Sequence, residues 1–169
     1  YMGKFVDKSQ TIDNNDTYGS KQNFIIWRYA EALLDYAEVC YNLGNTTLAK
    51  EYLNKTRQRV HMPDIDNVTM ESIMNERRVE MAFEETTYWD LLRWGIAEEK
   101  MNGASNPLKA MRIDVTTKGD VTTTKYTISN LNKSPEKVRY FTKRQYYLPL
   151  PWSEIKYHGI AQNPDWTEQ

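Results

Sequence analysis

The sequence has little of what most catalytic and metal sites are made from. Its one cysteine, Cys40, excludes a disulfide within the chain. The two histidines, His61 and His158, have no acidic or cysteine partner at metal-ligand spacing. No glycine-rich loop of the kind that cradles phosphate occurs. The sequence therefore predicts no metal centre and no cofactor.

An excess of charge and a long apolar run are missing as well. The 22 basic and 23 acidic side chains give a net charge of −1, so a nucleic-acid partner is not expected. No apolar run approaches the ~20 residues that a helix needs to cross a bilayer. The 169 residues suffice for one domain with a core. The first residue is Tyr1 and no signal peptide is visible, so we expect a processed product or a piece of a longer protein.

Aromatic residues, by contrast, are abundant for so polar a chain, with twelve tyrosines and five tryptophans. Trp27, Trp89 and Trp94 stand in apolar helical context, which favours packing in the core. Tyr18, in a polar loop, and Tyr126, in a predicted hairpin, are better candidates for an exposed ligand-binding surface.

Residues 24–62 are predicted to form a pair of helices. Residues 24–43 are apolar except for one narrow polar stripe, which indicates a helix buried on most sides. After Gly44, residues 46–60 form a second helix, and so short a connection makes the pair antiparallel, with Ala37 and Ala49 in contact. The spacing is similar to that of one tetratricopeptide repeat, and a single repeat needs neighbours to cover its faces. The signature positions are Leu33, Tyr36, Ala37, Cys40, Ala49 and Leu53. Cys40 is interpreted as a small core residue rather than a nucleophile.

Residues 69–95 are predicted to be helical up to Gly95, with an aromatic cluster at the end. Thr69 is a suitable N-cap. Arg77 falls on the apolar stripe, where an unpaired charge is costly. We therefore predict that Arg77 or Arg78 pairs with acids of the first helix or with Glu80 and Glu84.

Glu76, Glu80 and Glu84 also raise the question of catalysis, because glycosidases use pairs of carboxylates. Those enzymes place the two groups on opposing walls of a cleft, whereas these lie on one helix face. Ion pairs with Arg77 and Arg78 are the preferred interpretation.

The rest of the chain is less regular. Residues 1–6 are predicted to be a short strand and residues 7–23 a loop. Residues 96–101 suit a short helix, and residues 109–117 and 121–129 alternate around Lys118-Gly119-Asp120 as a β-hairpin does. Residues 140–169 form an extended closing segment with Pro149 and Pro151, interrupted by one turn at residues 153–156. The predicted fold is mainly α, with a small hairpin and an irregular C-terminal segment.

Four sequence blocks, in this order, resemble the C-terminal part of the SusD/RagB family. They are YMGKFVDKSQ, WRYAEALLDYAEVCYNLGN, NERRVEMAFEETTYWDLLRWG and YYLPLPWSEIKYHGIAQNPDW. The second resembles the family's RYAE-x-LL-x-YAE helix, and the third its ERR-x-E-x-AFEG-x-R-x-x-DL-x-RW block. The chain departs from the pattern at Glu85 and Asp165, where the family has glycine, at Thr87 in place of arginine, and at Leu150 in place of isoleucine.

The resemblance implies a surface-exposed outer-membrane lipoprotein of Bacteroidetes with several tetratricopeptide-like helix pairs. Such a protein captures glycans, or in some cases peptides, and sits as a lid over a TonB-dependent transporter of the SusC type, and it is not an enzyme. By this comparison residues 1–169 hold the last helix pair and lack the upstream pairs and the lipidated cysteine. No ligand-binding residue is carried over by motif. The matched polar residues, assigned to structure, are Arg28, Glu31, Glu38, Glu76, Arg77, Arg78, Glu80, Glu84, Asp90 and Arg93.

Three other functions stay open at this stage. One is a peptide-binding receptor of the RagB kind. Another is a tetratricopeptide-type protein-interaction module, including an intracellular one. The third is a fragment of a glycoside hydrolase.

Overall fold

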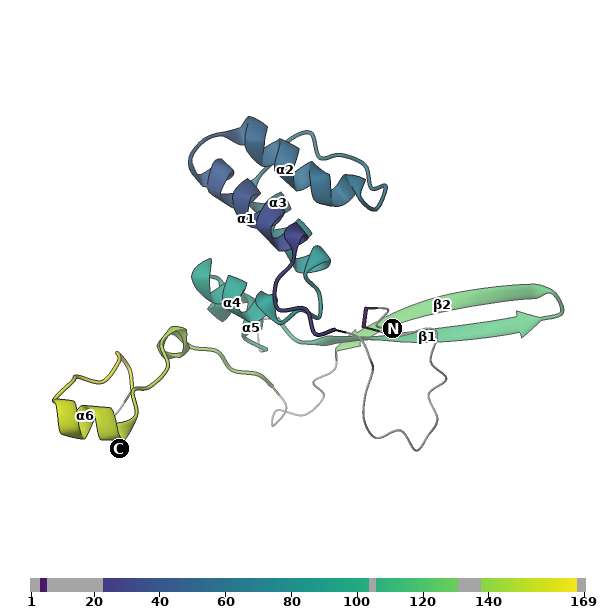
Figure 1. Ribbon diagram of the computed structural model, residues 1–169. Helices are drawn as coiled ribbons and strands as arrows, with labels where there is room; N and C mark the ends of the chain where they lie inside the picture. Colours follow the sequence, from purple (N-terminus) through teal and green to yellow (C-terminus); the bar gives the residue numbers. More distant parts are fainter. Residues whose placement is uncertain (1–3, 6–22, 104–105, 131–137, 167–169) are drawn as a thin grey trace. The chain divides into compact units, whose positions relative to one another are not determined.

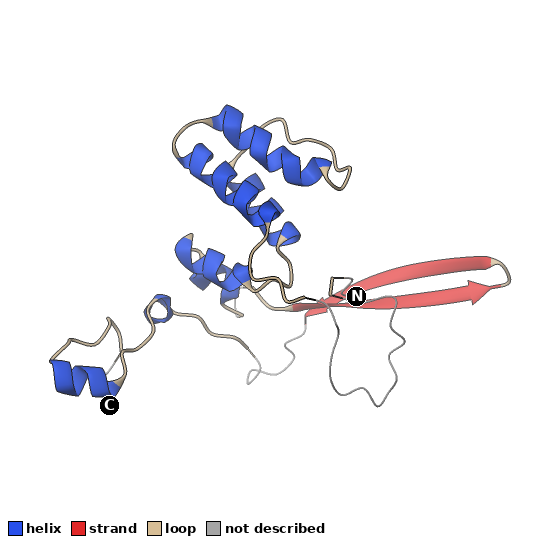
Figure 2. Ribbon diagram, in the orientation of Figure 1, coloured by secondary structure: helices blue, strands red, loops and turns tan. Residues whose placement is uncertain are grey.

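The computed structural model describes residues 4–5, 23–103, 106–130 and 138–166, which divide between two compact units, Tyr1–Thr87 and Tyr88–Gln169 (Figure 1). Within the described residues the chain is mainly helical, with six α-helices and one two-stranded antiparallel hairpin (Figure 2). This confirms the predicted fold class. None of the helices described combines the length and the apolar character that crossing a membrane requires.

The first unit is built on the predicted helix pair, α1 (Tyr29–Asn42) and α2 (Thr46–Gln58). Gly44 makes the turn with a φ of +80°, and the side chain of Asn45 caps α2 by accepting the backbone N–H of Leu48 at 3.1 Å. Ala37 and Ala49 are both fully buried in one core cluster, as expected for small residues between packed helices.

The start of α1 differs from the prediction by five residues. Arg28 has extended backbone and forms the N-cap, so residues 24–28 precede the helix. The expectation that α1 is buried on most sides was also wrong. Among the described elements, α1 makes its main contacts with α2 and α3, and its residues Tyr29, Tyr36 and Val39 are exposed.

The third helix, α3 (Met70–Glu80), completes the core of this unit. Thr69 and Ser72 form a capping box, in which each side chain accepts the backbone N–H of the other. Ile73 and Met81 from this segment join Leu34 and Leu53 from the helix pair, and all four are almost wholly buried.

Residues 69–95 are not one continuous helix, which corrects the prediction. α3 ends at Glu80, and α4 (Thr86–Arg93) begins after a break in which Phe83 and Glu85 have φ of +66° and +61°. Backbone in this left-handed region favours glycine. Glu85 and Asp165, the two positions where the family pattern has glycine, both adopt it, and the φ of Asp165 is +64°. Both positions therefore have a backbone conformation that suits glycine, although neither residue is glycine.

The second unit contains the predicted short helix, α5 (Ala97–Met101), and the predicted hairpin, β1 (Lys109–Lys118) and β2 (Val121–Asn130). Each strand is one residue longer than expected. The register pairs Met111 with Ile128 and Ile113 with Tyr126. Because side chains alternate along a strand, these four lie on the same face of the hairpin, and three of them are exposed.

The closing segment is more helical than predicted. The 3₁₀-helix η2 (Lys143–Tyr146), in which the side chain of Gln145 accepts the backbone N–H of Thr142 at 2.6 Å, interrupts the expected extended run. The single turn expected near residue 153 is part of α6 (Trp152–His158), which ends at Gly159 with a φ of +64°.

Lys4 and Phe5 lie in a turn, and the other residues of the expected N-terminal strand lie outside the described part of the chain, as do residues 7–22 of the expected loop. Core packing was wrong for Trp27 and Trp89, which are 64% and 61% exposed, whereas Trp94 is half-buried.

Candidate functional site

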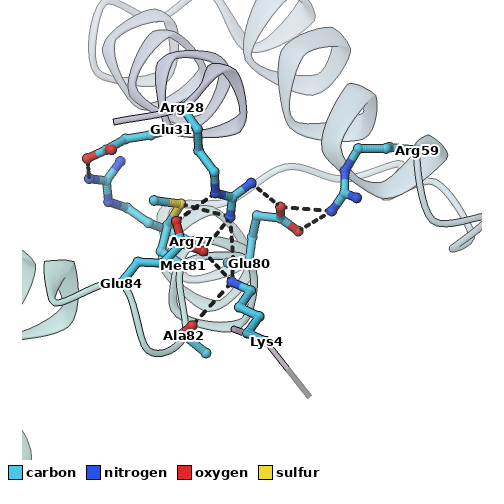
Figure 3. A network of polar contacts seen from close by, with 9 residues as sticks. All are labelled: Lys4, Arg28, Glu31, Arg59, Arg77, Glu80, Met81, Ala82 and Glu84. Atoms are coloured by element: carbon cyan, nitrogen blue, oxygen red, sulfur yellow. Dashed lines mark hydrogen bonds and ion pairs between the residues drawn. The ribbon is translucent and has the colours of Figure 1, made fainter. Parts of the chain in front are cut away.

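A cluster of charged side chains, here called the Arg28 cluster, comprises Lys4, Arg28, Arg59, Glu80 and Glu84 (Figure 3). Arg28 donates through Nε to Glu84 at 2.6 Å and through Nη1 to Glu80 at 2.7 Å. Arg59 donates to both oxygens of the Glu80 carboxylate, at 2.9 and 3.0 Å. Lys4 pairs with Glu84. Each carboxylate of the cluster is therefore shared by two cations.

Local structure explains why these groups meet. The backbone carbonyls at the C-terminal end of a helix lack partners within the helix. Lys4 donates to the carbonyl oxygens of Glu80 and Ala82, at 2.5 and 3.2 Å, and Arg28 donates to that of Glu80 at 2.7 Å. The cluster thus closes the end of α3 with positive charge, which the helix dipole also favours.

The same contacts change the ionisation of two members. Burial opposes the charged form of Glu84, whose side chain is 4% exposed, but the hydrogen bonds from Arg28 and Lys4 outweigh it and lower the pKa of the carboxyl. The hydrogen bond to Glu84 raises the pKa of Arg28 above its already high value. Both groups are therefore held in their charged forms.

A second set of ion pairs links the three helices of the first unit. Arg77, almost fully buried, pairs with Asp35 and, at 3.3 Å, with Glu31, both on α1. This confirms the prediction that Arg77 meets acids of the first helix. The preferred partners of the three glutamates, however, were wrong, because Glu76 pairs with Arg57 at 2.5 Å. Arg78 is exposed.

A hollow of about 650 Å³ lies beside the Arg28 cluster. Its lining consists of Lys4, Phe5, Asn23, Ile25, Arg28, Arg59, Glu80 and Glu84. Glu80 and Glu84 are already bound to cations, so neither is poised as the acid or nucleophile that glycoside hydrolysis requires. Within the described residues, no three histidine, cysteine, aspartate or glutamate side chains gather where they could hold a metal ion. The structure thus assigns this site to stability.

A second hollow, of about 810 Å³, lies within the second unit. Its lining consists of Leu92, Gly95, Ile96, Glu98, Glu99, Asn102, Lys143, Tyr146 and Tyr147. The hydroxyl of Tyr146 accepts the backbone N–H of Glu98 at 3.2 Å, which connects η2 to the first turn of α5. Here an aromatic surface lies beside several polar side chains.

Of the two tyrosines singled out from the sequence, only Tyr126 is among the described residues, and it is in the lining of neither hollow. Tyr18 lies outside the described residues, and Tyr126 is exposed on β2 opposite Ile113. Sequence reasoning missed Tyr146 and Tyr147 as surface residues. The available signal was the aromatic run just before Pro149, which was interpreted only as extended backbone.

The sequence is similar to those of SusD-like proteins. The family model described as "SusD family" matches residues 1–166. A SusD-like protein of Bacteroides ovatus is 26% identical over 90% of this chain and 32% of its own length. SusD-like protein P38 of Formosa agariphila is 35% identical over 64% of this chain and 22% of its own length.

Solved structures agree with this. The crystal structure of a SusD-like protein from Bacteroides fragilis superposes with a TM-score of 0.64 at 29% identity, over 85% of this chain and 26% of that one. The chain thus spans about a third or less of the length of these relatives, and it corresponds to their C-terminal portion. Since the family model covers nearly every residue, the chain belongs to the SusD family, whose members are non-catalytic binding proteins.

Proposed function

We propose that the intact protein is a non-catalytic receptor for an oligosaccharide at the cell surface, and that it passes its ligand to a SusC-type TonB-dependent transporter in the outer membrane. The observation that carries this proposal is membership of the SusD family over residues 1–166. Residues 1–169 are then the C-terminal part of one SusD-like domain.

The described side chains support a binding role in two ways. The carboxylates that resemble a catalytic pair, Glu80 and Glu84, are neutralised by cations. Tyr126 and Tyr147 present exposed aromatic rings. Sugar rings alternate C–H faces with hydroxyl groups, so they are commonly recognised by aromatic faces together with planar polar groups. Tyr18 and Tyr126 stay predicted contributors.

Attachment to the membrane is part of the proposal. In this family the anchor is a lipidated cysteine. Cys40 is buried within α1, so it is not available for that modification. We therefore propose that the anchor is supplied by a part of the protein outside the present chain.

The test is calorimetry of the full-length ectodomain with host, plant and microbial oligosaccharides and with peptides, accompanied by product analysis. Binding of a glycan without turnover is the expected result. Binding of peptides alone would favour a RagB-like receptor instead. Cleavage of any glycan, or a cytoplasmic location of the whole protein, would contradict the proposal.

A further inference from the structure

The hollow of the second unit, here called the Tyr147 hollow, has a lining that suits a sugar ring. We propose that it is a subsite for an uncharged sugar, which stacks on the ring of Tyr147. The inference rests on the proposed function, since it names a place and a ligand class for the glycan.

The walls of the Tyr147 hollow are held by contacts that need no ligand. Tyr146 is fixed by its hydrogen bond to the backbone of Glu98 and by the edge of its ring against Phe141, with ring centroids 5.2 Å apart. Phe141 is buried, and just before it the carbonyl of Arg139 accepts the backbone N–H of Gly103 at 2.8 Å. A Cβ on Gly103 would come within 2.9 Å of the backbone nitrogen of Arg139, so the two segments are closely packed. A preformed hollow loses little entropy when it binds a ligand.

The backbone of Tyr147 is held by a hydrogen bond, whereas its ring is exposed. Its carbonyl oxygen accepts the indole N–H of Trp166 at 2.8 Å, and the same indole donates to the carbonyl of Arg144 at 3.0 Å. The guanidinium of Arg144 lies 4.6 Å from the centre of the Trp166 ring. The side chain of Tyr147 is nevertheless 61% exposed. A tyrosine anchored in this way offers a large contact area with only two side-chain torsions to order.

The other lining residues supply apolar contacts and hydrogen-bonding groups for a sugar that stacks on this ring. Leu92 and Ile96 are apolar, and the polar groups are Glu98, Glu99, Asn102 and Lys143. Carboxylates accept from hydroxyl groups, while an ammonium donates to them. In the lining, Lys143 faces two carboxylates, and Glu99 is itself paired with Lys100 at 2.5 Å, so the local charges of these four side chains sum to zero. The lining therefore has no excess of positive charge to attract a carboxylate or sulfate, which favours neutral sugars over acidic ones.

The experiment uses the intact protein and titrates it with neutral pentasaccharides of glucose, xylose and mannose, and with an oligogalacturonide as the acidic probe. Tyr147→Ala should weaken binding of the neutral ligand by roughly tenfold or more, as the loss of an aromatic anchor does. Tyr147→Phe should bind within about threefold of the parent, because stacking needs the ring rather than the hydroxyl. Tyr157→Ala, at a tyrosine of α6 that is 75% exposed and lies outside the lining, is the matched control and should bind as the parent does.

The outcomes separate this inference from the proposed function. If the parent binds no oligosaccharide, both fail. If the parent binds and Tyr147→Ala binds equally well, only the subsite is overturned. Equal losses in Tyr147→Ala and Tyr147→Phe, or tighter binding of the oligogalacturonide than of every neutral probe, would also overturn it. Unchanged thermal melting of each variant shows that a lost affinity is not a loss of folding.

Discussion

Large apolar side chains are buried in the core of the first unit but exposed on the hairpin of the second. Leu34, Leu53 and Ile73 are fully buried among α1, α2 and α3. On the hairpin, Met111 and Ile128 lie opposite one another and are 56% and 67% exposed. A two-stranded hairpin without further cover is marginally stable in water, whereas three packed helices bury a common core.

The ion pairs of the two regions also differ in how far their side chains are exposed to water. The side chain of Arg77 is 6% exposed and bridges two helices, whereas that of Arg112 is 78% exposed and binds Asp114 on its own strand. Coulombic attraction is weak where water screens it and strong where water is excluded. Removing one partner is therefore costlier where the other charge is left buried than where water can solvate it.

The largest effect is expected from removing the buried charge of Arg77. Arg77→Met leaves Glu31 and Asp35 without this partner and should lower the free energy of unfolding by about 3–5 kcal/mol. Arg112→Met, the matched change on the hairpin, should cost at most about 1 kcal/mol. Urea denaturation of both variants measures the difference. An equal loss in the free energy of unfolding of the two variants would contradict the expected difference between the buried and the exposed ion pair.

A smaller effect is expected from overfilling the contact between α1 and α2. Ala37→Leu adds volume at a fully buried position and should destabilise by about 1–3 kcal/mol. Ala161→Leu, at an exposed position in the second unit, serves as the control and should change little. Thermal melting is the measurement, and an unchanged melting temperature for Ala37→Leu would mean that the core has room there.

The Arg28 cluster should make stability depend on pH. The pKa of Glu84 is lowered in the folded state, so its contribution is complete above the ordinary value of about 4.3 and is lost as the pH falls through the lowered one. Glu84→Gln should cost about 1.5 kcal/mol at neutral pH, and the gap to the parent should close in acid. Urea titrations from pH 7 to pH 2 test this, and a gap that does not change with pH would be the contrary result.

The smallest effect is expected on the hairpin face. Tyr126→Thr removes the aromatic ring that lies opposite Ile113 and should cost about 0.5 kcal/mol, the usual worth of a cross-strand pair. Thermal melting of the protein and of the variant measures this loss of stability. A loss above about 2 kcal/mol would indicate that this face is more closely packed than its exposure implies.

Sequence reasoning predicted best where periodicity and end signals agree. The helix pair was predicted from the turn at Gly44, and the start of α3 from Thr69 as an N-cap. The buried ion pair was predicted from the place of Arg77 on an apolar stripe. The hairpin followed from alternation around Gly119. In each of these cases the deciding information lies within a few residues of the element.

The errors have the opposite origin. Helical periodicity missed the break at Phe83 and Glu85, because neither residue type signals a left-handed turn, whereas the family pattern, which has glycine at position 85, indicates a turn there. The partners of Glu76 and Glu80 come from α2, so local spacing pointed to the wrong arginines. The Tyr147 hollow depends on α5 and η2, which are separated by about 40 residues, and no short pattern connects them.

The Arg28 cluster also has a consequence for the order in which the chain folds. Its contacts to Glu84 join residues that are 80 positions apart for Lys4 and 56 for Arg28, whereas α1 and α2 meet across one short turn. Distant contacts form late because a long loop must first be closed. All residues of the helix pair are added to the chain before Glu84 during synthesis. We therefore expect the contact of Lys4 with Glu84 to form last in the first unit. Such a late contact slows unfolding without speeding folding.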